Sequence, residues 1–307
     1  MAVTSLNMTE VSRELFPSLI SDIGPILSNS FRVENNPFAK TTSVNVFGER
    51  TGAEFTQSTG SYTATAAATT AIDVTFTEVY DYMTMNKLSF LQSPVDVVMG
   101  LLPTMGNAIA NKMFAMQNAL VTTAFTNTKI TSTSDNWDAD DLANAATTLS
   151  TTKTNKSGRY AVLEPAYFGA LSKDNAIQAA YAFGDDGVIK RNEIPSVHGF
   201  SLHMVPAVAD SGDVANMVGW VAGPEAFAVG FRPSFESAEV PTYASMGTYT
   251  DPNFGITITT RLWDGNDGNY HLWAGVGFGI ARGRVTALTA IVSARSPSGV
   301  DVPWALM

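Results

Sequence analysis

Histidine is the side chain best suited to acid–base and metal chemistry near neutral pH. This sequence has three, His198, His203 and His271. His198 and His203 are five residues apart, a spacing that places them on opposite faces of a strand and not on one ligand face. No His-Glu-x-x-His motif surrounds any of the three. The chain has no cysteine, which excludes disulfides, thiolate metal sites and cysteine nucleophiles. Structural roles for the histidines are therefore favoured.

Three carboxylates, Asp138, Asp140 and Asp141, have the spacing that opens a calcium-binding loop. Such a loop requires Gly at its sixth position and Glu at its twelfth. Ala143 and Leu149 stand at those positions instead. We therefore expect Asp138 to cap a helix that runs to about Leu149.

The run Gly275-Val276-Gly277-Phe278-Gly279 resembles a nucleotide-binding loop only in part. Its third glycine comes one residue too early for the dinucleotide-binding pattern, and residues 270–293 have the composition of strands. Glycines within a strand more often mark a close approach of backbone or a bulge. Neither a Gly-x-Ser-x-Gly elbow nor a P-loop is present. We therefore expect no catalytic residues and no cofactor or metal site.

The elements that surround these residues begin with a region that we interpret as an arm, residues 1–42. Thr9 can cap a short helix in which Pro17 and Pro25 would bend or stop the chain. Residues 43–80 follow as a long β-ribbon, because apolar and polar residues alternate in both of its halves. Its middle, from Gly48 to Thr70, is rich in Gly, Ser, Thr and Ala and too polar to build a core.

Residues 93–125 contain the longest helical pattern. Ser93-Pro94 is a helix start signal. One apolar stripe follows at spacings of three and four, through Val98, Leu102, Met105, Ile109, Met113, Met116 and Leu120. Pro103 predicts a kink, or two helices that meet near Leu102.

The second half of the chain is predicted as α/β up to residue 230 and mainly β after it. A strand over 159–163 is followed by a helix that Pro165 opens and that runs to about Leu171. Residues 194–208 and 217–221 alternate as strands do. The turn residues of 264–269 lie between two strand patterns, which predicts a hairpin.

Composition limits the possible partners. Charged residues make up only 15% of the chain, and the net charge is −10. A surface so poor in charge suits a protein that is covered by other copies. Strong nucleic-acid binding requires clustered Lys and Arg, and the densest basic spots are only Lys190-Arg191 and the Arg282/Arg284 pair. Residues 1–10 contain no secretory signal and no run of 18 apolar residues exists, so we expect neither export nor a membrane span.

The order of these elements is similar to that of the major capsid protein of tailed double-stranded-DNA bacteriophages. Four stretches carry the resemblance: GNAIANKMFAMQNALVTTAF (106–125), GRYAVLEPAYFGALSKD (158–174), IPSVHGFSLHMVPAVAD (194–210) and GWVAGPEAFAVGFRP (219–233). They resemble, in order, the spine helix, a strand–Pro–helix step, a Gly-strand-Val-Pro segment and the strand that follows. The resemblance covers residues 40–295.

The resemblance implies an α+β tailed-phage capsid fold in five parts. These are an N-terminal arm (1–42), an extended β-ribbon loop (43–86), a peripheral domain with a spine helix (87–134), an axial domain (135–230) and a return to the peripheral domain with closing strands (231–307). The implied function is self-assembly through pentamers and hexamers into an icosahedral capsid in the host cytoplasm. The implied partners are the chain itself, a scaffolding protein, a portal protein and enclosed double-stranded DNA that is not strongly bound.

We expect the ribbon and the arm to touch neighbouring subunits, because a two-stranded ribbon alone is marginal in water. The candidate contact residues are Gly48, Glu49, Arg50, Phe55, Tyr62, Phe31 and Phe38.

Two other classes stay open. An encapsulin-type nanocompartment shell shares the resembled fold and would enclose protein cargo in place of DNA. An extracellular β-rich adhesin or fibre protein is suggested by the Thr-rich ribbon, but it would need export.

Overall fold

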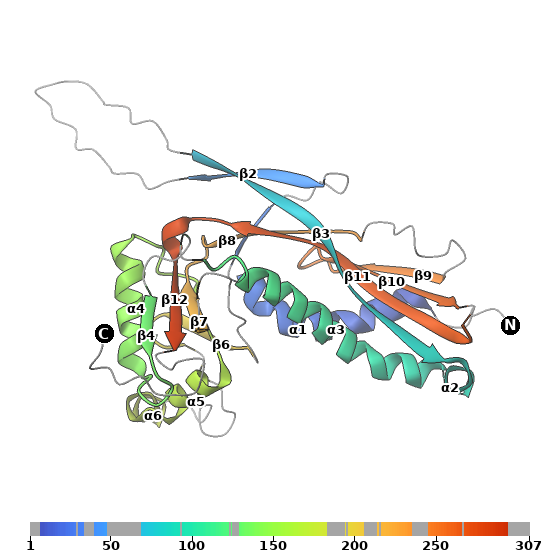
Figure 1. Ribbon diagram of the computed structural model, residues 1–307, viewed down its shortest axis with the longest axis horizontal. Helices are drawn as coiled ribbons and strands as arrows, with labels where there is room; N and C mark the ends of the chain where they lie inside the picture. Colours follow the sequence, from blue (N-terminus) through green and yellow to red (C-terminus); the bar gives the residue numbers. More distant parts are fainter. Residues whose placement is uncertain are drawn as a thin grey trace, which may run out of the picture.

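The chain folds into two β-sheets, each of which packs against its own helices (Figure 1). The computed structural model describes residues 7–28, 30–33, 40–47, 69–92, 94–122, 124, 129–182, 194, 196–205, 214, 216–234, 245–265 and 267–293. Within these ranges helices and strands are mixed, so the predicted α+β class is confirmed.

A seven-stranded sheet is organised around one central strand, β11. One edge of β11 pairs antiparallel with β3, and its other edge pairs antiparallel first with β10 and then with β8. β9 continues the sheet beside β10, β1 pairs parallel to β8, and β2 pairs antiparallel with the first half of β3. The strands are β1 (Ser30–Arg32), β2 (Thr41–Phe47), β3 (Thr69–Asn86), β8 (Phe227–Arg232), β9 (Ser245–Thr250), β10 (Thr257–Asp264) and β11 (Asn269–Arg282).

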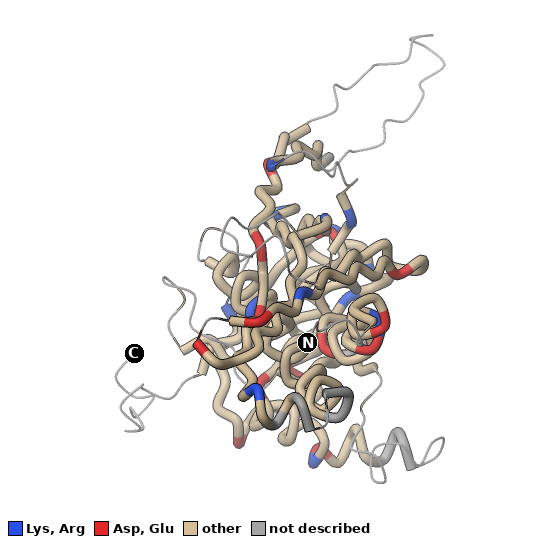
Figure 2. Tube along the Cα trace, turned by 90° about the vertical axis from the view of Figure 1, so that its right-hand side faces the viewer, with Lys and Arg blue, Asp and Glu red and all other residues tan. Residues whose placement is uncertain are grey.

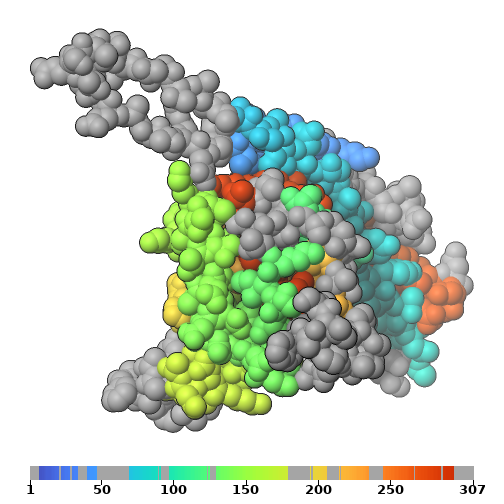
Figure 3. Space-filling view, turned by 60° about the vertical axis from the view of Figure 1, so that its left-hand side comes forward, coloured from blue at the N-terminus to red at the C-terminus, as the bar shows by residue number. Residues whose placement is uncertain are grey.

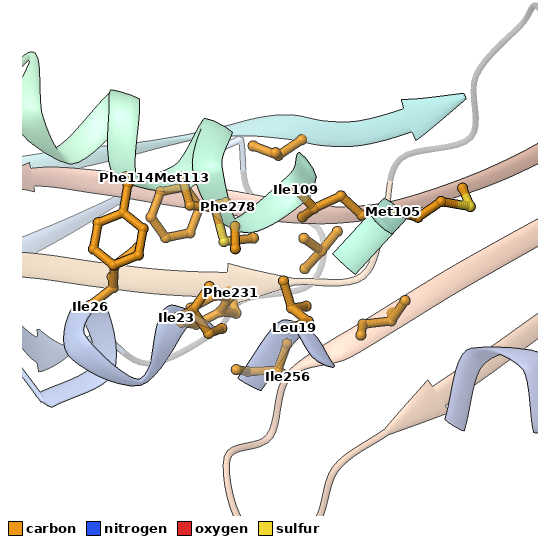
Figure 4. Close-up of a cluster of buried hydrophobic side chains, with 14 of the residues drawn as sticks. Leu19, Ile23, Ile26, Met105, Ile109, Met113, Phe114, Phe231, Ile256 and Phe278 are labelled. Atoms are coloured by element: carbon orange, nitrogen blue, oxygen red, sulfur yellow. The ribbon is translucent and has the colours of Figure 1, made fainter. Parts of the chain in front are cut away.

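Two long helices, α1 (Met8–Ser28) and α3 (Pro94–Asn118), cover one face of this sheet, and the short α2 (Lys87–Gln92) precedes α3. Their apolar stripes meet between the helices and the strands (Figure 4). The residues labelled there come from α1, from α3 and from the sheet side: Leu19, Ile23, Ile26, Met105, Ile109, Met113, Phe114, Phe231, Ile256 and Phe278.

Burial explains why the prolines do not end these helices, which was one of the two outcomes predicted at each, the other being a bend or kink. α1 continues through Pro17 and Pro25, and α3 is one helix that continues through Pro103. A proline inside a helix costs about 3 kcal/mol. Each fully buried Leu or Ile side chain stabilises the folded state by about 1.5–3 kcal/mol. α1 alone buries Leu15, Leu19, Ile23 and Ile26 completely, so tertiary packing outweighs the local signal.

A five-stranded sheet forms the second half of the molecule, in the order β4-β12-β7-β5-β6. The helices α4, α5 and α6 pack on one face of it, and strand residues of its other face join the core of the first half. Its central strands β5 and β7 are buried throughout, as expected of strands covered on both faces. The elements are β4 (Lys129–Ser132), α4 (Ala139–Thr151), β5 (Arg159–Leu163), α5 (Pro165–Lys173), α6 (Asn175–Ala182), β6 (Phe200–Met204), β7 (Met217–Ala222), the 3-10 turn η1 (Val285–Ala287) and β12 (Leu288–Ser293).

Three elements pack or pair differently from what the predicted ranges of the five parts imply. α1 lies in the predicted arm 1–42, yet it is part of the core. β8 straddles the boundary predicted at residue 230 and belongs to the seven-stranded sheet. β12 lies in the range predicted to return to the first half, 231–307, but it pairs with β7 and β4 of the five-stranded sheet. Strand pairing between distant segments, which no local pattern records, decides these positions.

The start of α1 lies directly on β9 and β10. The Ser12 hydroxyl donates to the carbonyl of Met8 (3.0 Å) and lies 2.7 Å from the Thr260 hydroxyl, and this network is buried. On β9, Gly247 lies so close to the Met8 backbone that a Cβ added there would overlap it. The absence of a side chain at position 247 therefore allows this helix to dock.

We predict that Gly247→Ala lowers the free energy of unfolding by about 1–3 kcal/mol, because the added methyl group must push α1 away from β9. Urea unfolding of the unassembled subunit measures the change. Gly100→Ala is the matched control. This glycine is in α3 with no atom within 4 Å of the added Cβ, and the substitution should stabilise by about 0.5–1 kcal/mol. Equal effects of the two substitutions would contradict this docking geometry.

Candidate functional site

The three histidines do not come together. His203 is on β6 of the five-stranded sheet, its ring centroid 6.2 Å from that of Tyr160, and burial lowers its pKa. His198 is in the turn before β6, and His271 is on β11 of the other sheet. In the ranges that the structure describes, no group of three or more His, Asp or Glu side chains could hold a metal ion.

Asp138 caps α4, as the sequence predicted. Its carboxylate accepts hydrogen bonds from the backbone N–H groups of Asp140 (3.0 Å) and Asp141 (3.2 Å). The carboxylates that resembled a calcium loop are therefore part of a helix N-terminus.

A hydrogen-bonded chain of Tyr82, His271 and Asp267 links β3 to the turn between β10 and β11. The Tyr82 hydroxyl is hydrogen-bonded to His271 Nδ1, and His271 Nε2 is 3.2 Å from Asp267 Oδ1. Hydrogen bonds from the backbone and side chain of Asn269, followed by that of His271, lower the pKa of Asp267 to about 2. Burial and then the Asp267 charge raise the pKa of Tyr82, which keeps the phenol protonated. Both imidazole nitrogens of His271 have partners, so this row of hydrogen bonds holds the β10–β11 hairpin against β3.

The glycine run is a stripe on β11 and not a nucleotide-binding loop. Gly275, Gly277 and Gly279 alternate along the strand, so they face the same side of the sheet. A Cβ at each would overlap a neighbouring side chain: that of Trp273 at Gly275, that of Arg232 at Gly277, and that of Val74, with Phe76 beside it, at Gly279. The predicted close approach is confirmed, and side chains make that approach.

The face of the seven-stranded sheet that points away from α1 and α3 carries a dense set of rings, which we call the aromatic face. Its residues lie on four adjacent strands, and three of its rings, those of Tyr82, Trp263 and His271, have planes within 14° of one another. Tyr80 and Tyr82 are 58% and 46% exposed. The members of the aromatic face are Tyr80, Tyr82, Met246, Arg261, Trp263, His271 and Trp273.

Sequence analysis did not single out this face, although a signal was present. In β3, Tyr80 and Tyr82 alternate with Val79, Met83 and Met85, so both sides of the strand are apolar. A strand with a large aromatic side chain on its second side either is covered there or exposes a binding surface.

The described part of the ribbon is the β2–β3 ladder, in which Thr41–Phe47 pairs with Thr69–Thr75. It rises from the upper side of the molecule (Figures 1 and 3), and its outermost described residues, such as Thr69 and Thr70, are exposed. This ladder confirms that the two ends of the predicted β-ribbon pair with each other. Its base packs on its own subunit, since Val74 and Phe76 of β3 cluster with Val33 and Ala228.

Of the predicted contact residues, one lies in the described ranges. Phe31 is on β1, half-buried against the cluster at the base of the ribbon. Six lie outside the described residues: Phe38, Gly48, Glu49, Arg50, Phe55 and Tyr62.

Charge is dispersed over the described chain. In the described part of the chain, Lys and Arg are scattered along the trace and form no continuous basic stripe in this view (Figure 2). Arg284, one of the predicted basic pair, is bound to Glu225 at 3.1 Å. No helix in the described ranges combines the length and the apolar character needed to cross a bilayer.

We predict that the Asp267 interactions make stability depend on pH below 4. Because folding lowers the pKa of Asp267 from its usual 3.8, its contribution is complete above about pH 4 and is lost as pH falls toward 2. Asp267→Asn should therefore flatten the plot of unfolding free energy against pH between 4 and 2, as measured by urea titrations. Asn269→Ala keeps the backbone N–H that donates to Asp267 but removes the side-chain donor. The slope of its plot should therefore lie between those of the parent and of Asp267→Asn. Parallel plots for all three proteins would contradict the assignment.

Neither a family model nor a curated protein matches this sequence. The structure nevertheless is similar to solved shells. It matches the capsid of cyanophage P-SCSP1u with a TM-score of 0.56 and 14% identity, over 88% of this chain and 87% of that chain. It matches the capsid of Ralstonia phage GP4 with a TM-score of 0.55 and 12% identity, over 87% and 88%. It matches a virus-like particle from Pyrococcus furiosus with a TM-score of 0.52 and 9% identity, over 91% and 98%.

At these identities the matches establish the fold. They extend over nearly nine-tenths of this chain and of each chain matched, so the likeness includes both sheets and not one common motif. The predicted fold class is thereby confirmed: this chain has the fold of phage capsid structures. The division into five parts stays a prediction.

Proposed function

We propose that this chain is a structural subunit that self-assembles, through pentamers and hexamers, into an icosahedral capsid enclosing a phage genome. The observation that carries the proposal is the match over almost the whole length to solved phage capsids. A closed shell requires heterologous contacts that close into rings, together with extensions that join the rings. On this proposal the protein acts by assembly and not by catalysis.

The ribbon is the extension best placed to join subunits. The described β2–β3 ladder lies at the upper side of the molecule (Figure 1), and Asn45 of β2 and Thr69 and Thr70 of β3, in its outer part, are exposed. We retain the predicted division into arm, extended loop, peripheral and axial parts, with α1 and β8 assigned to the peripheral part and β12 to the axial part. Many weak contacts of this kind sum to a stable particle.

The proposed partners are other copies of the chain, a scaffolding protein during assembly and a portal protein at one vertex. The acidic chain, with a net charge of −10, would enclose double-stranded DNA without binding it strongly. The proposed location is the virion capsid, after assembly in the host cytoplasm.

One observation favours a second function. The virus-like particle from Pyrococcus furiosus matches over 98% of its own chain, so the fold also occurs in a particle that is not named as a phage capsid. The alternative is the nanocompartment shell with protein cargo. Negative-stain electron microscopy of the purified protein tests both, because each requires uniform closed shells. Nuclease-protected DNA inside particles from infected cells supports the capsid, and a co-purifying enclosed protein supports the alternative. Monomers at all concentrations and in the presence of scaffolding protein would contradict both.

We predict that replacing residues 49–68 by a short Gly-Ser turn blocks shell assembly and leaves the subunit folded. The β2–β3 ladder ends at Phe47 and Thr69, so the turn closes an intact hairpin. The only large apolar side chains removed are Phe55 and Tyr62, which bounds the loss of stability at a few kcal/mol, about 1.5–3 for a fully buried ring. Thermal unfolding and size-exclusion chromatography with light scattering measure folding and assembly separately.

The control for this deletion keeps its length. The double variant Phe55→Ser with Tyr62→Ser keeps the full length of the ribbon and removes its two aromatic rings. It therefore distinguishes an effect of ribbon length on assembly from an effect of the two rings. Full-size shells from the deletion would refute the joining role. An unfolded deletion variant would show that the ribbon belongs to the core of its own subunit.

We predict that the subunits are held without covalent bonds. Some tailed-phage capsids join a Lys of the extended loop to an Asn of a neighbour, but this sequence has no Lys between Lys40 and Lys87. Lys87 is bound to Asp264 at 2.6 Å, and that hydrogen bond raises its pKa, which keeps the amine protonated. Denaturing gels of mature particles should show one band near 32.7 kDa, and a ladder of covalent oligomers would contradict this.

A further inference from the structure

One row of the aromatic face crosses four strands in register. Tyr82 of β3 lies opposite Trp273 of β11, Trp273 opposite Arg261 of β10, and Arg261 opposite Met246 of β9. Directly opposed residues in a sheet have their side chains on the same face. The adjacent Gly247 faces α1, which places Met246 and the rest of the row on the side away from the helices.

Arg261, in the middle of this row, is a charged side chain without an acceptor. It is 6% exposed, and its Nε is buried without a hydrogen-bond partner. Among the described residues its guanidinium makes no hydrogen bond and no ion pair. Its one specific contact is with the Trp273 ring, whose centroid lies 5.0 Å from the guanidinium carbon.

This arrangement is unfavourable in an isolated subunit. A guanidinium has five N–H donors and keeps its charge at all accessible pH values. Burying a charge is costly unless an opposite charge and hydrogen bonds compensate. The Trp273 ring offers a cation–π attraction, which accepts no hydrogen bond. The group that this site lacks is therefore an anionic hydrogen-bond acceptor for the guanidinium. A carboxylate fits, because its two oxygens can accept two parallel hydrogen bonds from one arginine.

The surroundings of Arg261 have the composition of a protein interface. Tyr82 and Met246, at the two ends of the row, are 46% and 63% exposed, and Tyr80 is exposed beside them. Tyrosine, tryptophan, methionine and arginine are the residues enriched at interface centres. Met246 is unbranched and flexible, so its movement can admit a partner to the guanidinium.

Charge complementarity selects the partner. The chain has 28 Asp and Glu residues against 18 Lys and Arg residues, so a second copy carries more carboxylates than cations overall. We propose that Arg261 anchors an inter-subunit contact, in which the aromatic face of one copy receives an Asp or Glu side chain of a second copy. This inference rests on the proposed function, because it names the partner of a surface within the shell.

The test compares folding with assembly in Arg261→Met. Replacement of a buried, uncompensated charge by an apolar side chain of similar length leaves the unassembled subunit as stable as the parent or more stable. Assembly, followed by light scattering against subunit concentration, should require a roughly 10-fold higher concentration or more, as for loss of an interface hot spot. Arg261→Lys keeps the positive charge but cannot donate two parallel hydrogen bonds. The concentration it requires for assembly should lie between those of the parent and of Arg261→Met.

Lys112→Met is the matched control, since Lys112 is exposed on α3, away from the aromatic face, and its loss changes the net charge equally. It should assemble as the parent does. A second readout places a photoreactive benzoylphenylalanine at position 246. Irradiation of assembled protein should join two copies through a peptide that contains Asp or Glu.

Three results overturn the proposal. One is assembly of Arg261→Met at the parent's concentration. Another is a lower melting temperature of the Arg261→Met subunit, which would show a role within the subunit. The third is a melting temperature that phosphate raises in the parent but not in Arg261→Met, with unimpaired assembly of that variant, which would assign the site to a free anion.

Failure of the proposed function would look different. If the parent forms no shell, the same variants are compared for dimers and small oligomers by analytical ultracentrifugation. Oligomers that Arg261→Met loses would support the contact without a shell. Equal association of parent and variant, or no association of either, would refute it.

Discussion

The antiparallel ladder between β3 and β11, from Phe76 to Asn86 on β3, is the interaction on which the rest of the structure depends. β3 continues from this ladder into the ribbon, so the direction of the ribbon is fixed by the body of the subunit. β11 continues from it through η1 into β12 of the other sheet. The glycine stripe of β11 leaves room for the side chains of Trp273, Arg232 and Val74, which a Cβ at these positions would overlap. One pair of strands therefore orients the ribbon, the aromatic face and the second half of the molecule.

The two halves share a core, which limits their independence. Trp220 of β7 is fully buried, and its indole N–H donates to Asn118 at the end of α3 (3.0 Å). The neighbouring Gln117 is also fully buried, and both of its amide atoms lack a hydrogen-bond partner. The end of α3 therefore contacts the five-stranded sheet through a junction that is both packed and polar.

Sequence predicted those features that a short stretch of chain determines by itself. The Asp138 cap, the helix opened by Pro165 and the hairpin at 264–269 were all found. Each proline was predicted to bend or to end its helix, and the helices do not end there, because complete burial of an apolar stripe outweighs the loss of single hydrogen bonds. The sheet membership of β8 and β12 was missed because pairing joins segments far apart in sequence. The predicted ribbon contacts stay predictions.

The aromatic face was missed for the same reason, and the reason bears on function. Residues 82, 246, 261 and 273 form one row only when four strands align, so no local motif marks them. Most large apolar side chains of the described residues are buried. Arg261, in contrast, is a buried cation without an acceptor, within an aromatic face that exposes Tyr80, Tyr82 and Met246. On the proposed function, a second copy supplies the acceptor that Arg261 lacks, so the specific chemistry of this face is completed only by assembly.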